Sequence, residues 1–171
     1  HLEITREVAR RFNYLYGKVL PEPAPLLGEH TLLPGTDSRK MSKSYDNYIA
    51  LSDPPDVIKK KVSLMITDPQ RERRRDPGRP EVCTVFRFQQ IFNAAEIPQI
   101  ESGCRTAEIG CVQCKELLAR RLTEFMGPIH EKRRELEGNP RYLEEILFSG
   151  EEKARQAAAA TLEAVRGAMG I

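Results

Sequence analysis

The second half of this chain carries apolar residues at helical spacing almost without interruption, and this pattern limits the fold more than any other feature. Near the end, Ala154, Ala158, Leu162 and Val165 recur along one helical face. Apolar residues three and four positions apart are typical of amphipathic helices, whereas strands require alternation. The predicted helices of this half span residues 110–137, 142–148 and 151–168. We therefore expect the second half to be entirely helical.

The first half mixes helices with extended and turn-rich segments. Helical spacing predicts an amphipathic helix over residues 2–19, which a proline-rich stretch after residue 20 ends. A second helix is predicted to start at Ser52-Asp53-Pro54-Pro55, where an N-cap candidate precedes prolines that a first turn tolerates, and to end near residue 65. The other expected elements are short strands at 31–33 and 48–51, a helix at 85–95, and irregular segments at 68–80 and 99–109.

Charge is informative in its distribution and not in its total. The 171 residues carry a net charge of only +2, and their length suffices for one domain or two small parts. Between Arg39 and Arg79, however, eleven basic residues face six acidic ones. Such an excess suits a polyanion such as ATP or RNA, or alternatively a surface of ion pairs.

The sequence has no feature of a membrane or secreted protein. No apolar run approaches the roughly 20 residues that a membrane-spanning helix needs, and the N-terminus lacks a signal-peptide pattern. We therefore expect a soluble, cytoplasmic protein. Because the chain begins with His1 and not Met, we also expect it to be a processed protein or a piece of a longer one.

Residues 40–44 form a compact cationic loop, which reads KMSKS. Lys40 and Lys43 stand three positions apart, and hydroxyl residues lie between and after them. Cations and hydroxyl donors in one short loop are what a phosphate-rich ligand requires. The alternative is a solvated basic surface loop.

All four cysteines of the chain fall within one 32-residue window: Cys83, Cys104, Cys111 and Cys114. Disulfides are not expected in the cytosol, where thiols stay reduced. Four thiolates can hold Zn²⁺ or a [4Fe–4S] cluster. Only the last two form a Cys-x-x-Cys pair, whereas structural zinc usually takes two such pairs, so the layout favours the wider iron–sulfur cluster without deciding the matter. Three further alternatives are unliganded buried thiols, a redox dithiol and a three-cysteine site.

Several motifs, taken in order, resemble those of tryptophanyl-tRNA synthetases. They are residues 1–6 (HLEITR), the KMSKS loop, 49–53 followed by a proline, 67–69 (TDP), 110–115 (GCVQCK), 128–129 and the closing helix at 150–170. The resemblance covers essentially the whole chain but only the C-terminal half of the family's length. A subset of the family carries a four-cysteine [4Fe–4S] motif in this region, with similar spacing.

The resemblance implies a mainly α fold in two parts. Residues 1–52 would be the tail of a class I, Rossmann-type catalytic domain, including the KMSKS loop. Residues 53–171 would be a helical domain that binds the anticodon region of the tRNA and carries the cysteine site. The nucleotide-binding first half of the enzyme would be a missing partner, so the chain alone is not expected to charge tRNA.

The resemblance also implies a function and its residues. The family activates tryptophan with ATP and Mg²⁺ and then transfers it to tRNA(Trp), typically as a homodimer. Lys40 and Lys43 would be catalytic, and Met41, Ser42 and Ser44 would complete the ATP-binding loop. The four cysteines would hold the metal. The candidate tRNA contacts are Arg105, Lys115, Arg120 and Arg121.

Two other classes compete with this interpretation. One is a stand-alone, metal-stapled RNA-binding helical module, which would have no need of the KMSKS loop. The other is an iron–sulfur redox protein, which would require reversible reduction with a partner. Nucleotide binding through Lys43 would favour the synthetase over both.

Overall fold

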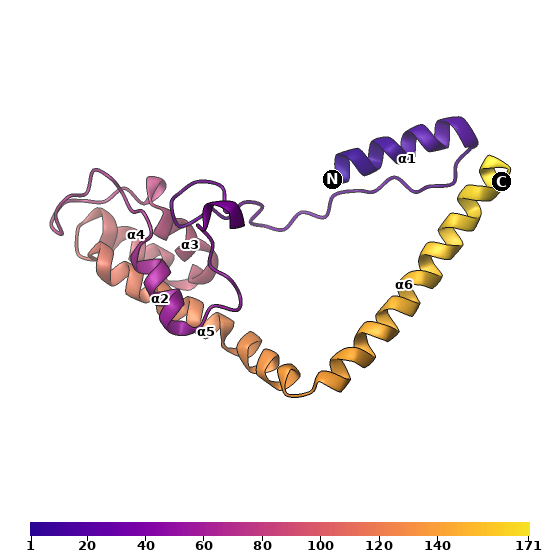
Figure 1. The fold of residues 1–171 in the computed structure, drawn as a ribbon. Helices are drawn as coiled ribbons and strands as arrows, with labels where there is room; N and C mark the ends of the chain where they lie inside the picture. The colour runs from indigo at the N-terminus through magenta and orange to yellow at the C-terminus, as the bar shows by residue number, and fades with distance from the viewer. The chain divides into compact units, whose positions relative to one another are not determined.

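The computed structural model describes residues 1–171, and it consists of helices joined by turns and extended segments (Figure 1). The α-helices are α1 (Leu2–Tyr16), α2 (Pro55–Ser63), α3 (Thr84–Phe92), α4 (Ile97–Arg105), α5 (Cys111–Glu137) and α6 (Pro140–Met169). Short 3₁₀ turns lie at Lys43–Tyr45, Pro80–Val82 and Ala94–Glu96. The predicted mainly α fold is confirmed. No helix combines the length and the apolar character that crossing a membrane would require.

The two predicted strands, 31–33 and 48–51, do not form. The chain contains no strand, and its one β-bridge joins Pro34 to Lys40. An extended segment becomes a strand only when a neighbour satisfies its backbone donors and acceptors. In the 48–51 segment, a side chain satisfies one of these donors instead of a neighbouring strand: the carboxylate of Asp53 accepts a hydrogen bond from the backbone N–H of Ala50 at 2.8 Å.

Two further predictions about where helices lie also need correction. The segment predicted to be irregular, 99–109, contains most of α4, which has Pro98 in its first turn and buries Ile100. Proline fits a first turn because its missing N–H would have no intrahelical partner there. The expected interruption at Ser149-Gly150 is absent, since α6 is continuous. A glycine inside a helix costs only about 1 kcal/mol relative to alanine, and the alanine-rich sequence that follows offsets it.

The first helix ends three residues earlier than predicted, and a side chain explains this. Asn13 accepts hydrogen bonds from the backbone N–H groups of Val19 and Leu20, both at 2.9 Å, and donates to the Leu20 carbonyl at 2.7 Å. Gly17, with φ of 97°, turns the chain back. The helix therefore ends at Tyr16, before the prolines are reached.

The chain divides into two compact units. Unit 1 comprises residues 1–28 and 136–171, and unit 2 comprises residues 29–135. The predicted boundary at 52/53 separates functional parts and stays a prediction.

Unit 2 contains the apolar core. Phe88 and Leu122 lie almost completely out of solvent, and Phe92 stacks on Phe88 with ring centres 6.2 Å apart. Figure 1 shows α2, α3 and α4 gathered around the first half of α5. The buried core residues are Ile58, Val62, Met65, Cys83, Val85, Phe86, Phe88, Ile100, Leu118, Ala119, Leu122 and Met126.

Unit 1 has almost no core of its own. Ala9 is its buried apolar residue, and α6 buries none. The contacts that hold α1 to the following segment are polar: Arg6 Nε donates to the Pro23 carbonyl at 3.1 Å, and Arg10 pairs with Glu22 at 2.8 Å. Apolar side chains such as Phe148 are left exposed.

Replacing Phe88 by alanine should lower the free energy of unfolding by about 3–5 kcal/mol, because a large buried ring is lost and a cavity remains. Phe148→Ala removes the same atoms from a side chain that is 70% exposed, compared with 1% for Phe88. That control should change stability by less than about 0.5 kcal/mol. Urea unfolding followed by circular dichroism would measure both, and equal losses would contradict this core.

Candidate functional site

The KMSKS loop directly follows a tight turn at residues 35–39, which backbone hydrogen bonds close. The Gly35 N–H donates to the Arg39 carbonyl at 2.7 Å, and the Ser38 N–H donates to the Gly35 carbonyl at 3.0 Å. Ser38 adopts a left-handed φ of 68°, and its hydroxyl hydrogen-bonds that of Thr84 at the start of α3. The Ile66 N–H donates to the Thr36 carbonyl at 3.0 Å. The base of the loop is therefore fixed to the core of unit 2.

The loop itself is shaped by its own serine. Ser42 Oγ accepts a hydrogen bond from the Ser44 N–H at 3.2 Å and so caps the 3₁₀ turn Lys43–Tyr45. Asp46, with φ of 49°, ends that turn in the left-handed region. Met41 packs against the apolar core. Ser42 and Met41 thus hold the loop's shape, and Ser44 contributes a backbone donor.

The two lysines of the loop have no partner. The side chains of Lys40 and Lys43 form neither a hydrogen bond nor an ion pair. Neighbouring cations behave differently, since the Arg39 guanidinium pairs with Asp37 at 2.6 Å and lies 4.6 Å from the Tyr45 ring centre. Two uncompensated ammonium groups on one short loop are suited to bind a polyphosphate.

Asn47 lies at the centre of the loop's hydrogen bonds. Its Oδ1 accepts from the Ser42 N–H at 2.8 Å, and its Nδ2 donates to the Lys40 carbonyl at 3.1 Å and to Asp37 Oδ1 at 2.7 Å. The amide donor holds the pKa of Asp37 below its ordinary value. Asn47 could not be found from the sequence, because a polar residue just outside a motif carries no signal that it is buried.

The segment after the loop is tied to α2 and α5. Asp53 forms an ion pair with Lys61 at 2.6 Å, and the Lys61 ammonium also lies 4.7 Å from the Tyr48 ring centre. His130 on α5 hydrogen-bonds the Leu51 carbonyl at 2.9 Å through Nε2. These contacts place the loop and α5 as far as His130 within unit 2.

The structure brings all four predicted cysteines together from three helices. Cys83 precedes α3, Cys104 lies in the last turn of α4, and Cys111 and Cys114 lie in the first turn of α5. All four are free thiols. The ends of α3, α4 and α5 that carry them lie on the same side of the core of unit 2, although the thiols are not placed as a metal-binding group.

Burial is the main influence on these thiols. It raises the pKa of Cys83 and of Cys104, and it raises the pKa of Cys114 to about 11. Hydrogen-bond donors act in the opposite direction: Gln89 Nε2 lies 3.6 Å from the Cys114 sulfur, and Arg71 Nη1 lies 3.8 Å from that of Cys104. On balance, burial favours the neutral thiol at Cys83, Cys104 and Cys114.

The residues around the sulfurs are chemically compatible with a bound soft metal ion or cluster. A Cβ atom at Gly78 would lie 2.6 Å from the Cys104 sulfur, so only glycine leaves that side of the thiol open. The Arg71 Nε is buried and has no hydrogen-bond partner. However, no group of three or more histidine, cysteine or acidic side chains is placed to hold a metal ion. Four thiols are a donor set that a cluster takes, but their placement here does not define a metal site.

A buried ion pair secures the loop that leads to Cys83. Asp68, 5% exposed, accepts hydrogen bonds from Nε and Nη2 of Arg79, the shortest at 2.6 Å, and from the backbone N–H groups of Arg79 and Gln70. The Arg79 guanidinium therefore holds the pKa of Asp68 far below its usual range. The sequence placed Asp68 in a polar linker and gave no sign of this pairing.

The four candidate tRNA contacts do not gather at one place. Arg105 pairs with Glu101 and Glu81, at 3.0 and 3.2 Å, and Arg121 pairs with Glu124 at 3.0 Å. Lys115 donates to the Ser63 carbonyl at 2.8 Å. Arg120 has no such partner and is the most available of the four for an external anion.

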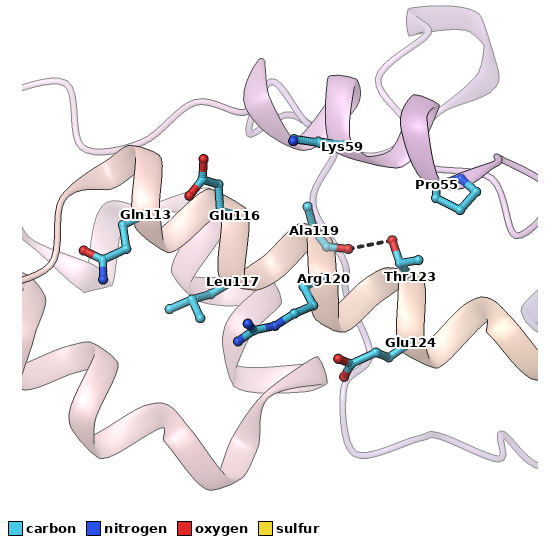
Figure 2. Close-up of a pocket in the computed structure, with 9 residues that line it drawn as sticks. All are labelled: Pro55, Lys59, Gln113, Glu116, Leu117, Ala119, Arg120, Thr123 and Glu124. Carbon is cyan, nitrogen blue, oxygen red and sulfur yellow. Dashed lines mark hydrogen bonds between the residues drawn. The ribbon is translucent and has the colours of Figure 1, made fainter.

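Arg120 and Lys115 line adjoining hollows between α2 and α5. The hollow beside Arg120 has a volume of about 610 Å³, and Figure 2 shows Pro55 and Lys59 from α2 on one side of it. The hollow beside Lys115 measures about 150 Å³ and shares Lys59. A third hollow, of about 450 Å³, lies at the start of α5 beside Arg73 and Arg74. The sequence showed these basic residues only as part of a charge excess.

The chain matches a known protein family over most of its length. The family model described as "tRNA synthetases class I (W and Y)" matches residues 1–127, which include the loop and all four cysteines. This chain belongs to the class I tRNA synthetases for tryptophan and tyrosine.

Individual relatives of this synthetase chain are tryptophan–tRNA ligases. It is 50% identical to that of Aquifex aeolicus and 46% identical to that of Thermotoga maritima, with 100% of the chain covered in both. It spans 44% and 53% of the length of those two relatives. A crystal structure of tryptophanyl-tRNA synthetase from Campylobacter jejuni, complexed with ADP and tryptophan, matches the whole chain with a TM-score of 0.78 and 28% identity. The chain covers 54% of that structure.

Replacing Asp68 by asparagine should lower the free energy of unfolding of this synthetase chain by about 1–3 kcal/mol, because a charged acceptor for several hydrogen bonds is lost. The control Asp56→Asn alters an exposed carboxylate in the first turn of α2 and should cost less than about 0.5 kcal/mol. Denaturant unfolding of both variants would measure this, and a neutral Asp68→Asn would show that the pair contributes little.

Proposed function

We propose that this chain is the part of a tryptophan–tRNA ligase that supplies the ATP-binding KMSKS loop and the tRNA-binding helices. The enzyme activates tryptophan with ATP and transfers it to tRNA(Trp). The observation that carries the proposal is the loop at residues 40–44, whose two lysines are unpaired on a rigid base. The ligase identity of both relatives over the whole chain supports it.

The proposed chemistry assigns a role to each part of the loop. When the tryptophan carboxylate attacks the α-phosphorus of ATP, negative charge grows on the departing pyrophosphate. Lys40 and Lys43 stabilise that charge more in the transition state than in the ground state, which lowers the barrier. Ser42 and Met41 keep the loop in shape, and Ser44 presents its hydroxyl toward the phosphates. Mg²⁺ accompanies ATP as part of the substrate.

We further propose that the four cysteines hold a [4Fe–4S] cluster, with zinc as the alternative. The burial of the thiols, the donors at Arg71 and Gln89 and the open side at Gly78 support a sulfur-rich cofactor. A cluster held there would join the ends of α3, α4 and α5. Its contribution would be structural, because it would fix the helices that approach the tRNA.

The hollows between α2 and α5 are the proposed tRNA-facing surface. Arg120 is unpaired there, and Lys59 and Lys115 lie beside it. Cations in a groove of this kind contact phosphates or the exposed bases of a single-stranded loop. The acidic residues Glu116 and Glu124 in the same groove limit non-specific binding to any polyanion.

Lys43→Ala in the complete ligase that carries this chain should lower kcat of tryptophan-dependent ATP–pyrophosphate exchange by about 10²–10³-fold, since one transition-state donor is lost. The control Lys153→Ala removes an exposed lysine of α6 and should leave the rate unchanged. Exchange that does not depend on Lys43 would contradict the assignment. RNA binding with no nucleotide response would favour the RNA-binding module instead.

Anaerobically purified protein should contain about four iron and four acid-labile sulfide per chain. Its visible spectrum should show broad charge-transfer absorption, and Cys104→Ser should lose both signals. One zinc without sulfide would make the site a structural zinc site and leave the synthetase proposal intact. Absence of both metals would overturn the cluster proposal.

A further inference from the structure

We propose that Asn47 is the positioning residue of the KMSKS loop, holding both lysines where the phosphates of ATP will lie. This inference rests on the proposed function, since it assigns Asn47 a part in the same reaction. Asn47 lies outside the five-residue motif and does not touch the substrate. It acts through the backbone of the loop.

The contacts of Asn47 bracket Met41. The side-chain amide binds the backbone carbonyl of Lys40 on one side of Met41 and the backbone N–H of Ser42 on the other. Lys40 is thereby fixed directly. Lys43 is fixed through Ser42, which caps the 3₁₀ turn that Lys43 begins. One side chain thus sets the backbone beneath both ammonium groups.

Only a carboxamide satisfies all three partners. The Ser42 N–H can only donate, whereas the Lys40 carbonyl and the Asp37 carboxylate can only accept. The partners therefore require an acceptor on one side of the residue and two N–H donors on the other. A carboxylate of the same shape would keep the first bond but would place its second oxygen against two acceptors.

The surroundings leave Asn47 no second arrangement. It is 2% exposed, and its backbone carbonyl accepts from the Thr36 N–H at 2.8 Å. A Cβ atom at Gly35 would lie 2.2 Å from Asn47 Nδ2 and 2.9 Å from the Asn47 carbonyl oxygen. Gly35 is therefore required for close approach, and any side chain there would displace the amide. The base of the loop is therefore held in one arrangement.

The test is Asn47→Asp in the complete ligase, compared with wild type and with Lys43→Ala. A displacement of about 1 Å can cost about 10²-fold in rate, so kcat for ATP–pyrophosphate exchange should fall by about 10–100-fold. KM for tryptophan should stay unchanged, because the loop contacts only the phosphates. Asn93→Asp is the matched control: Asn93 is also 2% exposed and also donates to a carboxylate, that of Glu96 at 3.2 Å, away from the loop.

The pH profile separates positioning from a general loss of stability. In the Asn47→Asp variant, the new carboxyl group would face the carboxylate of Asp37. The negative charge of Asp37 would raise the pKa of the new carboxyl group. Protonation would restore one O–H donor, so the rate of this variant should recover as the pH falls through that pKa. Wild type and Asn93→Asp should show no such recovery. Gly35→Ala is a second, independent variant that should lower kcat in the same way without adding a charge.

The outcomes distinguish the two proposals. Three results together support the positioning role. Both Asn47→Asp and Gly35→Ala lower kcat, the rate of Asn47→Asp recovers at low pH, and Asn93→Asp stays active. Wild-type kcat in Asn47→Asp, with Lys43→Ala inactive, overturns that role and leaves the proposed function standing. Equal losses in Asn47→Asp and Asn93→Asp, without the recovery, also overturn it. An inactive wild-type ligase overturns the proposed function and the positioning role with it.

Discussion

The single apolar core that α2, α3, α4 and α5 build together, with Phe88, Leu118 and Leu122 among its most buried members, is what the rest of unit 2 depends on. The four cysteines span 31 positions of the sequence, and this core brings the elements that carry them, at the ends of α3, α4 and α5, near one another. The same core receives Met41 from the KMSKS loop. Thr84, at the start of α3, anchors Ser38 at the base of that loop. Apolar burial therefore places both chemical features, although neither is itself apolar.

Polar contacts then refine what the core places. Asp68 and Arg79 fix the segment that enters Cys83, and Asn47 fixes the backbone of the loop. The side chains of Asp68 and Asn47 are both buried and both hydrogen-bonded, as most buried polar groups are. The exposed parts are the cations, Lys40 and Lys43, which have no partner within the chain. Rigid, satisfied supports beneath free charges are the arrangement expected of a site that binds an anion repeatedly without reorganising.

The two units differ in how they are stabilised. Unit 2 has a continuous apolar core, whereas unit 1 relies on hydrogen bonds from Arg6, Arg10 and Asn13 and leaves apolar side chains exposed along α6. A helix with an apolar face and no partner gains little from burial, so its stability comes from local propensity, here the alanine run before Thr161. The chain spans about half the length of the two ligases described above.

By itself, the sequence determined the helical class, most of α1, α2, α3 and α5, the KMSKS loop and the set of four cysteines. These are local features, because helical periodicity and short motifs are properties of neighbouring residues. The tertiary structure alone decided the absence of strands at 31–33 and 48–51, the burial of Asn47 and Asp68, and the gathering of the cysteines. Each depends on partners that lie far away in the sequence: a strand needs a neighbour, and a buried amide needs the groups that enclose it. Periodicity carries no record of such partners, so only folding could reveal them.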